Sequence, residues 1–504
     1  MKMLREAADK LGRITMYRLV LGVLALMAVA SFALTFLGAL PYTPIDIAAS
    51  AVVAVGVALL SGHLLAAAVQ SAAQWESSAI TGFLVFFLFW PTADPGQLWR
   101  IALVSVIASV SKYVLVWRGR HLFNPVAIAA VIASVTGLTA AVWWPANAYL
   151  FPVVLVGAIA VVVRTRKLLM FALYVVVATL SGTVVLVLNG TAALDALPVV
   201  LLSYPVVFLG GFMLTEPLTL PPRRWQQLML AAVAGVLVSV PFHVGPLYNS
   251  PELTLVVMNL AAALFARRSG IRLTLLGRKL LSPTVVEFSF RPKRPLDFVP
   301  GQYLELVIPH GKPDSRGTRR MLSPTSVPGS AELVTVATSM PAKTSTAKRA
   351  LRLKQEGAVL SATGVWGDFV LPRDPSVPVL LVAGGIGITP FVSQLRSDRM
   401  RGIRRDVTLV YAARSAAEYA YLDDLVGDGV RIILAGPEAP AQLPVGCELL
   451  GAERISGELL ALRMPDLRAR HAFVSGPPSL VEDLREDLKR QGVRSVHTDV
   501  FLGY

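Results

Sequence analysis

The pattern of hydrophobic positions divides the chain into two halves. Residues 1–266 are dominated by long apolar runs, such as 17–40 and 168–188. About 20 apolar residues span the hydrocarbon core of a bilayer, so these runs predict transmembrane helices. Counting every apolar run gives about ten spans, several of them short, such as 78–91. We therefore expect a polytopic α-helical membrane domain over residues 1–268, which excludes a wholly soluble protein.

The second half changes to the alternating pattern of short strands. Runs such as 285–290 and 303–308 predict a small antiparallel β-barrel over residues 269–375. From residue 376 onward, buried strands alternate with glycine turns and helices. The strands are expected at 377–382, 406–411, 430–434 and 471–475. This order predicts a doubly wound parallel α/β domain over residues 376–504.

Charge supports this division. Residues 1–266 carry only 14 of the 47 Lys and Arg residues and 8 of the 32 Asp and Glu residues. With ten spans and the N-terminus inside, the basic loop residues fall on the cytoplasmic side, with Arg100 as the exception. The formal net charge of +15 is then explained by membrane topology and not by nucleic-acid binding. We expect a multi-pass protein of the cell (inner) membrane, with the lipid bilayer as partner and the C-terminal half in the cytoplasm.

Cysteine and histidine content limits the redox chemistry. The single cysteine, Cys447, excludes a disulfide scaffold, a Cys-only zinc site and a plant-type iron–sulfur centre. An organic cofactor or haem is then required for electron transfer. His63, His121 and His243 lie near span ends in three different segments, so they cannot build the two bis-histidine haem sites of a transmembrane ferric reductase.

Polar residues interrupt the apolar half at two places. Lys112 precedes the segment 121–125, and Glu216 lies in the segment 210–217. Polar groups at membrane depth are costly and tend to mark pathways or sites. The alternative is structural: Asn124 and Thr215 would cap helices, and Lys112 would extend toward the membrane surface.

These segments resemble those of a membrane subunit. Their order along the chain is similar to that of the Rnf complex D subunit and of the B subunit of the sodium-pumping NADH:quinone reductase. The matching motifs are Ala79-Ile80-Thr81-Gly82, Lys112, Phe123-Asn124-Pro125 and Thr215-Glu216-Pro217. The resemblance implies FMN or another flavin in the membrane domain, quinone or another electron acceptor, and electron-transport partner subunits. The family's Ser/Thr-Gly-Ala-Thr site for covalent FMN is missing, and the nearest sequence, Ser181-Gly182-Thr183, suits a helix contact better.

Two glycine turns in the second half predict a dinucleotide site. Gly384, Gly385 and Gly387 follow a buried strand, where they let the backbone approach a pyrophosphate. The alternative is structural, because a tight strand-to-helix turn that binds no ligand would also favour glycine. The second turn, 475–478, leaves another parallel strand at the same sheet edge, and the two turns together favour NAD(P)H.

A flavin site is expected upstream. Arg320 is suited to a flavin phosphate, and Ser323 and Ser326 are suited to hydrogen bonds with the flavin. The cluster Thr344-Ser345-Thr346 begins a helix, either as an N-cap or as a pyrophosphate cradle.

Residues 271–504 resemble the ferredoxin-NADP reductase superfamily. The resemblance implies FAD and NAD(P)H as cofactors. Arg320, Ser323 and Ser326 match the flavin motif, in which Leu322 replaces a stacking tyrosine. The nucleotide motifs match at Gly384, Gly385, Gly387, Thr389, Pro390, Gly476 and Pro477, and Ser475 replaces a cysteine beside the nicotinamide. Both replacements are expected to change the rate or potential of hydride transfer and not the reaction.

The combined prediction is a membrane flavoenzyme. It would move hydride from NAD(P)H to FAD, with Ser323, Ser475 and Tyr504 nearest the chemistry, and pass electrons to a membrane or transmembrane acceptor. Tyr504 would cover the flavin face, or it is a free chain end. Arg414 would meet a 2′-phosphate or only the pyrophosphate. The alternative from another class is a transporter or channel whose reductase-like domain senses NAD(P)H, with Lys112 and Glu216 along the ion route.

Overall fold

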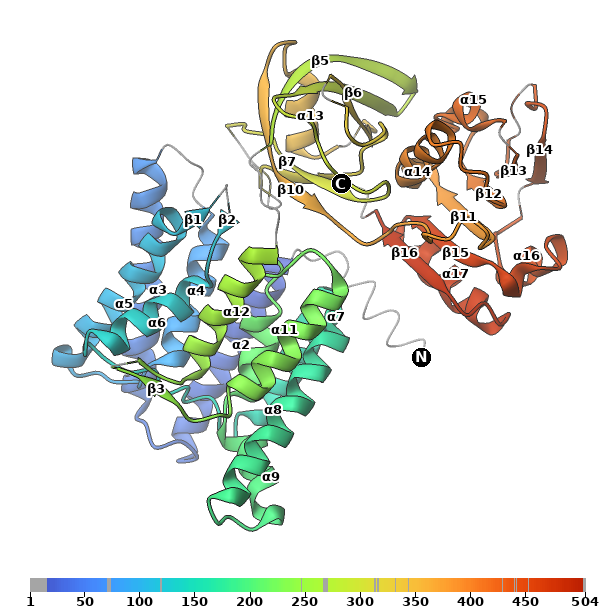
Figure 1. Ribbon diagram of the computed structural model, residues 1–504. Coiled ribbons are helices and arrows are strands. Elements are labelled where there is room, and N and C mark those ends of the chain that lie inside the picture. The colour runs from blue at the N-terminus through green and yellow to red at the C-terminus, as the bar shows by residue number, and fades with distance from the viewer. Residues whose placement is uncertain are drawn as a thin grey trace. The chain divides into compact units, whose positions relative to one another are not determined.

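The chain forms two compact units in the computed structural model, residues 1–268 and 269–504. Figure 1 shows their elements. The structure describes residues 16–69, 74–117, 120–245, 247–265, 271–311, 314, 317–330, 332–342, 344–427, 429–438, 440, 442–451 and 453–501. Each unit is described by itself.

The first unit is helical. Its helices are α2 (Met16–Phe36), α3 (Pro44–Ala68), α4 (Trp75–Leu88), α5 (Pro95–Val114), α6 (Pro125–Val135), α7 (Phe151–Arg164), α8 (Leu168–Leu188), α9 (Ala193–Ser203), α10 (Val206–Phe208), the π-helix η1 (Leu209–Leu214), α11 (Arg224–Leu237) and α12 (Pro251–Phe265). Two short hairpins, β1–β2 (Val116–Trp117, Arg120–His121) and β3–β4 (His243–Val244, Leu247–Tyr248), connect helices. Several helices begin at side-chain caps, including Thr43 with Asp46 and Asn124.

The prediction of about ten membrane spans is wrong. Within the described residues, three helices are long and apolar enough to cross a membrane, namely α2, α3 and α8. The pair 193–203 and 206–214, bent by 47°, gives a fourth if it counts as one span. The other apolar runs form short helices: α4 has 14 residues and rises about 21 Å, against a hydrocarbon core of about 30 Å. Counting apolar runs cannot distinguish these from full spans.

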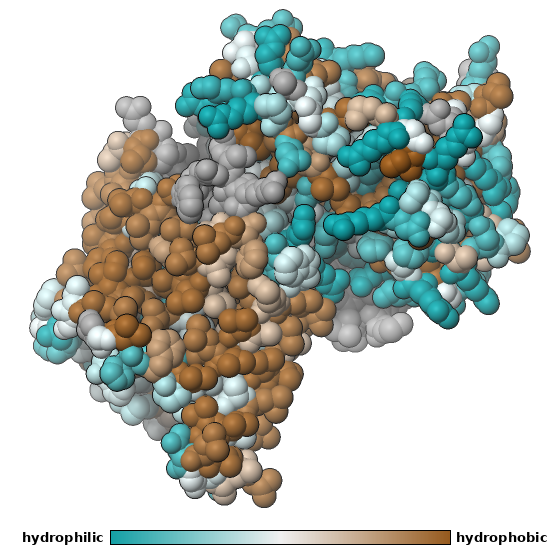
Figure 2. All heavy atoms as spheres, viewed as in Figure 1, coloured by the Kyte–Doolittle hydropathy of each residue, from teal (hydrophilic) through white to brown (hydrophobic). Residues whose placement is uncertain are grey.

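The surface of the first unit is strongly apolar. Figure 2 shows hydrophobic side chains over most of its visible face. The exposed hydrophobic side chains of this unit include Val29, Val52 and Leu180, which are 65%, 72% and 60% exposed on α2, α3 and α8. Aromatic residues fill the interior, where Phe86, Phe87 and Trp144 pack together. An exposed apolar surface of this extent is unusual for a soluble protein and suits contact with lipid.

The second unit begins with an antiparallel sheet. Its strands are β5 (Ile271–Ser282), β6 (Val285–Pro292), β7 (Tyr303–Val307), β8 (Arg319–Leu322), β9 (Val334–Ser339) and β10 (Val359–Trp366), in the order β8-β7-β10-β5-β6-β9. Helix α13 (Thr346–Leu353) packs Ala347 and Leu351 into the core of this sheet. One bridge, Pro324 to Val336, links the segment after β8 to β9. The antiparallel arrangement agrees with the sequence, whereas closure into a barrel stays a prediction.

The unit ends with a parallel sheet. Its strands are β11 (Val379–Gly384), β12 (Val407–Ala412), β13 (Val430–Ala435), β14 (Cys447–Gly451), β15 (His471–Gly476) and β16 (Val496–Val500), ordered β14-β13-β12-β11-β15-β16. The helical segments are η2 (Gly385–Ile388), α14 (Thr389–Met400), η3 (Ala416–Glu418), α15 (Leu422–Leu425), α16 (Gly457–Arg463), η4 (Leu467–Ala469) and α17 (Pro478–Arg490).

Helices cover both faces of this sheet. Along β11, Leu381 packs with Phe391 of α14, and its neighbour Leu380 packs with Leu484 of α17. Successive strand residues point to opposite faces, so the strands are buried on both sides. The doubly wound fold is confirmed, although β14 and β16 were not expected. The strand order reverses between β11 and β15, where such sheets bind ligands.

Candidate functional site

The two predicted glycine turns meet where the strand order reverses. Gly384 ends β11, and Ser475 and Gly476 end the neighbouring strand β15. A Cβ atom at Gly387 would lie 2.4 Å from the Ser475 carbonyl oxygen and 2.8 Å from Gly476 Cα. A Cβ atom at Gly384 would also collide, with the Pro477 ring at 2.9 Å. These glycines therefore allow the two turns to touch.

Gly385 differs from its neighbours. Its φ is +53°, a conformation that favours glycine, and a Cβ atom there would meet nothing within 4 Å. The turn leads directly into α14, where the Thr389 hydroxyl donates to the Ile386 carbonyl at 3.1 Å and Pro390 occupies the first turn. A helix N-terminus beside a glycine that has free space at its Cβ position is suited to binding a pyrophosphate. Gly385, rather than Gly387, is the position at which a ligand can approach.

The Ser475 hydroxyl is the most distinctive polar group of this edge. Ser475 is fully buried, and its Oγ finds no hydrogen-bond partner among the described residues. A buried hydroxyl without a partner is costly, which is consistent with a bound group supplying the missing hydrogen bond. Pro477, two positions after Ser475, is exposed, and so is Arg414, which lies in the loop that follows the neighbouring strand β12.

Arg320 on β8 is buried and already well bonded. Its guanidinium pairs with Asp314 at 3.1 and 3.3 Å and donates to the Gly317 carbonyl at 2.9 Å. It also approaches Ser345 Oγ at 3.4 Å. The residue therefore holds its own loop together, and any flavin phosphate would share it with Asp314.

The remaining residues of the flavin motif lie close in the fold. Ser323 and Ser326 are buried on the segment after β8, and Ser326 Oγ accepts from the Thr335 backbone N–H at 3.2 Å. Leu322 is buried in the core of the antiparallel sheet, where it pairs with Leu304. Its side chain therefore serves packing within the sheet.

The three hydroxyl residues of the cluster 344–346 have different hydrogen-bonding roles. Ser345 caps α13 by accepting from the Lys348 N–H at 3.4 Å, as the N-cap interpretation predicts. Thr346 Oγ1 accepts from the Asp314 N–H at 2.9 Å. Thr344 Oγ1 is buried with no hydrogen-bond partner in the described part of the chain. Of these three residues, only Thr344 therefore has a hydroxyl group that is available to hydrogen-bond a cofactor.

Tyr504 lies outside the described residues, so its predicted stacking is not addressed by the structure. Residues 500 and 501, just before it, lie beside the second turn of the nucleotide site. Val500 of β16 pairs with Gly476, and the Phe501 N–H donates to the Gly476 carbonyl at 2.8 Å.

Sequence reasoning missed several residues that join the two halves of this unit. Ser393 Oγ donates to the Ser326 carbonyl, and Arg396 Nη1 donates to the Thr325 carbonyl, both at 2.8 Å. Tyr421 donates to Glu287. The partners are 67 to 134 positions apart in the sequence, so no local motif could have identified them.

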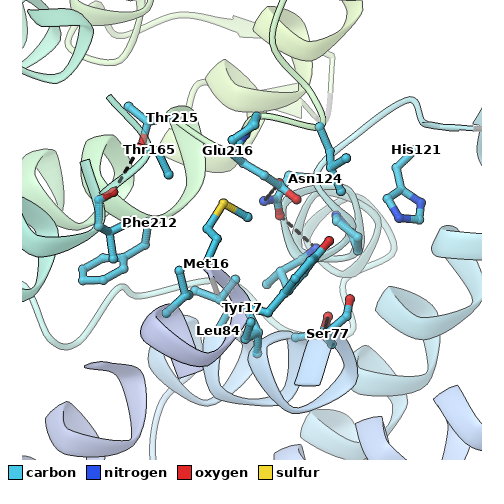
Figure 3. Close-up of a pocket in the computed structure, with 18 of the residues that line it drawn as sticks. Met16, Tyr17, Ser77, Leu84, His121, Asn124, Thr165, Phe212, Thr215 and Glu216 are labelled. Carbon is cyan, nitrogen blue, oxygen red and sulfur yellow. Dashed lines mark hydrogen bonds between the residues drawn. The ribbon is translucent and has the colours of Figure 1, made fainter. Parts of the chain in front are cut away.

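The first unit contains a pocket where its polar motifs converge. Residues from every matched motif segment line it, including Ile80, Thr81, Lys112, Asn124, Thr215 and Glu216. Figure 3 shows the side chains of Asn124 and Glu216 turned toward each other, and Asn124 Nδ2 donates to Glu216 Oε2 at 2.9 Å. Lys112 Nζ donates to the Ser77 carbonyl at 2.9 Å. Asn124 also caps α6, so its structural and pocket-lining roles coincide.

The nearest sequence to a covalent flavin motif has a structural explanation. Ser181 Oγ lies 2.8 Å from the Gly235 carbonyl, so its hydroxyl can donate to α11. A Cβ atom at Gly182 would lie 3.0 Å from Val200. These close approaches support the interpretation of a helix contact.

No protein-family model matches the chain. Its C-terminal part is similar to reductase proteins. The reductase component of propane 2-monooxygenase from Mycolicibacterium goodii is 28% identical over 206 residues, 39% of this chain and 57% of that protein. The ferredoxin–NAD(+) reductase component of the Xanthobacter autotrophicus alkene monooxygenase system is 28% identical over 233 residues, 45% of this chain and 66% of that protein. The crystal structure of the Amycolatopsis cytochrome P450 reductase GcoB aligns with a TM-score of 0.41 and 25% identity, covering 47% of this chain and 71% of that one.

The chain thus spans only about three fifths of the length of these curated relatives. Its C-terminal part resembles ferredoxin reductase-like flavin and nucleotide domains, as predicted. The proteins similar to this part are NAD(P)H-dependent, FAD-containing oxidoreductases of the ferredoxin reductase type. The activity, substrates and partners of the whole chain are proposals, and the resemblance of the first half to Rnf and sodium-pumping reductase subunits stays a prediction.

Proposed function

We propose that this chain is a membrane-bound flavin oxidoreductase that takes hydride from NAD(P)H onto FAD and passes electrons to an acceptor reached through its helical unit. One observation carries the proposal. The turns at Gly385 and Ser475 lie at the ends of adjacent strands of a doubly wound sheet, beside a buried hydroxyl without a partner. Similarity to reductase components supports the same chemistry.

The residues fit the two cofactors. The N-terminus of α14 and the open side of Gly385 would receive the pyrophosphate of NAD(P)H, and Ser475 would hydrogen-bond the nicotinamide end. On the flavin side, Thr344 and Arg320 would bind the FAD pyrophosphate, and Ser323 would bind the flavin edge. When bound, FAD supplies the chemistry of a two-electron acceptor that can release electrons singly. The protein supplies position and the exclusion of water, so no acid–base dyad is required.

Membrane attachment rests on the helical unit. Its three long apolar helices expose large side chains such as Val52 and Leu180, which favours a lipid environment. Basic residues at 164–167 and 223–224 support a cytoplasmic position for the loops after α7 and before α11, since such loops collect Lys and Arg. We propose the inner membrane as the location, with the reductase unit in the cytoplasm.

The pocket around Asn124 and Glu216 is the proposed route to the acceptor. It combines apolar walls, such as Leu84 and Phe212, with polar groups that can orient a ring carbonyl. A quinone or a second flavin would suit this chemistry, in line with the resemblance to the Rnf and sodium-pumping reductase subunits that the sequence motifs predict.

The relatives favour a second candidate acceptor. The two described above are reductase components of monooxygenase systems, one named as a ferredoxin–NAD(+) reductase. The acceptor would then be a ferredoxin or oxygenase partner, and the helical unit would serve as an anchor.

Acceptor competition tests the proposal. The purified chain, loaded with FAD in lipid nanodiscs, is mixed with NADH or NADPH and then with a short-chain quinone or a ferredoxin. Rapid bleaching of the flavin followed by reoxidation with quinone supports the membrane route, and reoxidation by ferredoxin alone supports the anchor. A flavin that NAD(P)H never bleaches would contradict both and favour a sensor domain.

A further inference from the structure

Helix α14 connects the two candidate cofactor sites of the reductase unit. It begins at the glycine turn that would receive NAD(P)H, and two of its residues contact the segment 323–326 that would meet FAD. Ser393 Oγ donates to the Ser326 carbonyl at 2.8 Å, and Arg396 Nη1 donates to the Thr325 carbonyl at 2.8 Å. Residues three apart lie on the same face of a helix, so both bonds come from one side of α14.

A second group of contacts braces the same segment. Tyr421 donates to Glu287 on β6 and lies 3.3 Å from Thr325 Oγ1. The Arg396 guanidinium lies 5.3 Å from the centre of the Tyr421 ring and pairs with Asp424 at 2.7 Å. Arg396 therefore contacts the flavin segment and the residue that braces it.

The hydrogen bonds at Ser393 and Thr325 are protected from water, whereas the side chains of Arg396 and Asp424 are 28% and 35% exposed. Ser393 and Thr325 are fully buried. Burial, and secondarily the negative charge of Glu287, raises the pKa of the Tyr421 hydroxyl, so this group keeps its proton and remains a donor. Tyr421 also has a φ of +64°, which non-glycine residues rarely adopt. Backbone strain of this kind persists only where surrounding contacts hold it.

We propose that Ser393, Arg396 and Tyr421 form a clamp, called here the α14 clamp, that holds the flavin segment 323–326 at a fixed position relative to the nucleotide turn. These are positioning residues for hydride transfer. The inference rests on the proposed function and extends it, because it names the connection between the two cofactor sites. Hydride transfer requires near contact of the two rings, and a misplacement of about 1 Å can cost on the order of 10²-fold in rate.

The test uses the full-length chain loaded with FAD and the substitution Arg396→Gln. The matched control is Arg431→Gln, which also removes an arginine from a carboxylate pair, with Glu448 at 2.7 and 2.9 Å between β13 and β14. Arg396→Gln should keep its FAD and its reduction by dithionite, yet lose about 10- to 100-fold in the rate of flavin reduction at saturating NAD(P)H. The apparent KM should change by less than about threefold, because the nucleotide turn itself is intact. Arg431→Gln should match the parent.

Two further variants secure the interpretation. Arg396→Lys should recover part of the rate, because an ammonium can still donate to the Thr325 carbonyl. Ser393→Ala removes a single hydrogen bond with little change in volume, and it should slow reduction even if Arg396→Gln fails to fold. The clamp would be overturned if Ser393→Ala showed the parental rate of flavin reduction per bound FAD, and if Arg396→Gln, where that variant folds, did the same. A parent chain that binds FAD but is not reduced by NAD(P)H would instead overturn the proposed function, and the clamp with it.

Discussion

Replacing Gly387 by alanine should slow NAD(P)H oxidation by separating the two turns of the nucleotide site. The new Cβ atom would lie 2.4 Å from the Ser475 carbonyl oxygen, 2.6 Å from its carbonyl carbon and 2.8 Å from Gly476 Cα. All three are backbone atoms, so no side-chain rotation can relieve the contact. This differs from the sequence-based expectation that Gly387 serves to let the backbone approach the pyrophosphate.

The size of the effect follows from these distances. Ordinary contact begins near 3.4 Å, so the turn must retreat by about 1 Å from β15. Overpacking of this kind costs about 1–3 kcal/mol. For a unit of this length, each kcal/mol lowers Tm by about 2–4 °C. A displacement of about 1 Å at the site should also reduce the rate of flavin reduction by on the order of 10²-fold.

Stopped-flow reduction of the bound flavin measures the rate, and thermal unfolding measures the stability. Gly402→Ala is the control: its φ is +65°, a Cβ atom there meets nothing within 4 Å, and it follows the far end of α14. That variant bears a left-handed backbone cost of about 1–2 kcal/mol without a collision at the site. Both variants should lose stability, and only Gly387→Ala should lose rate. A parental reduction rate in Gly387→Ala would refute the reasoning.

Four further outcomes are expected. Thr344→Val should stabilise the FAD-free chain by up to about 1 kcal/mol in thermal unfolding, because it removes a buried hydroxyl without a partner, while FAD titration should show weaker binding. Arg320→Ala should lower FAD content per chain and also destabilise the protein, because it leaves the Asp314 carboxylate without this partner; full FAD content would count against the site. Lys112→Met should leave NAD(P)H reduction of FAD unchanged and slow quinone reduction; equal quinone rates would assign Lys112 a structural role. Burial, and then the charge of His471, lowers the pKa of His497 from its ordinary value of 6.5, against an opposing effect of Asp368. The folded state then binds fewer protons than the unfolded state, so stability should fall as pH drops below about 6.5, and His497→Phe should flatten that slope in unfolding curves.

The nucleotide site was accessible to sequence analysis because its signal is local. A buried strand followed by closely spaced glycines was expected at 377–382, and β11 occupies Val379–Gly384. The second turn was recognised in the same way, at the end of β15. The position of both turns at one sheet edge follows from their parallel strands, which share the direction in which they end.

The helical unit was less accessible because hydropathy does not report helix length. The run 78–91 contains no charged residue, yet α4 ends at Leu88 after 14 residues. Its neighbours within the unit, including Trp144 against Phe86, bury its apolar side chains without a full membrane crossing. Local composition cannot separate these two environments.

The α14 clamp could not be predicted because it is tertiary. In the sequence alone, Arg396 is an ordinary charged residue of a helix surface, and Tyr421 is an aromatic residue of a loop. Their importance arises only when the chain brings Thr325 and Glu287 beside them.

Anaerobic reduction of the flavin by NAD(P)H, followed by addition of quinone in the same nanodisc sample, tests the central claim most directly. The account predicts that NAD(P)H bleaches the FAD absorbance on mixing and that quinone then restores this absorbance in the parent chain. In Lys112→Met, the restoration by quinone should be slower. Bleaching without any reoxidation by quinone, in a sample that a ferredoxin reoxidises at once, would contradict the membrane route.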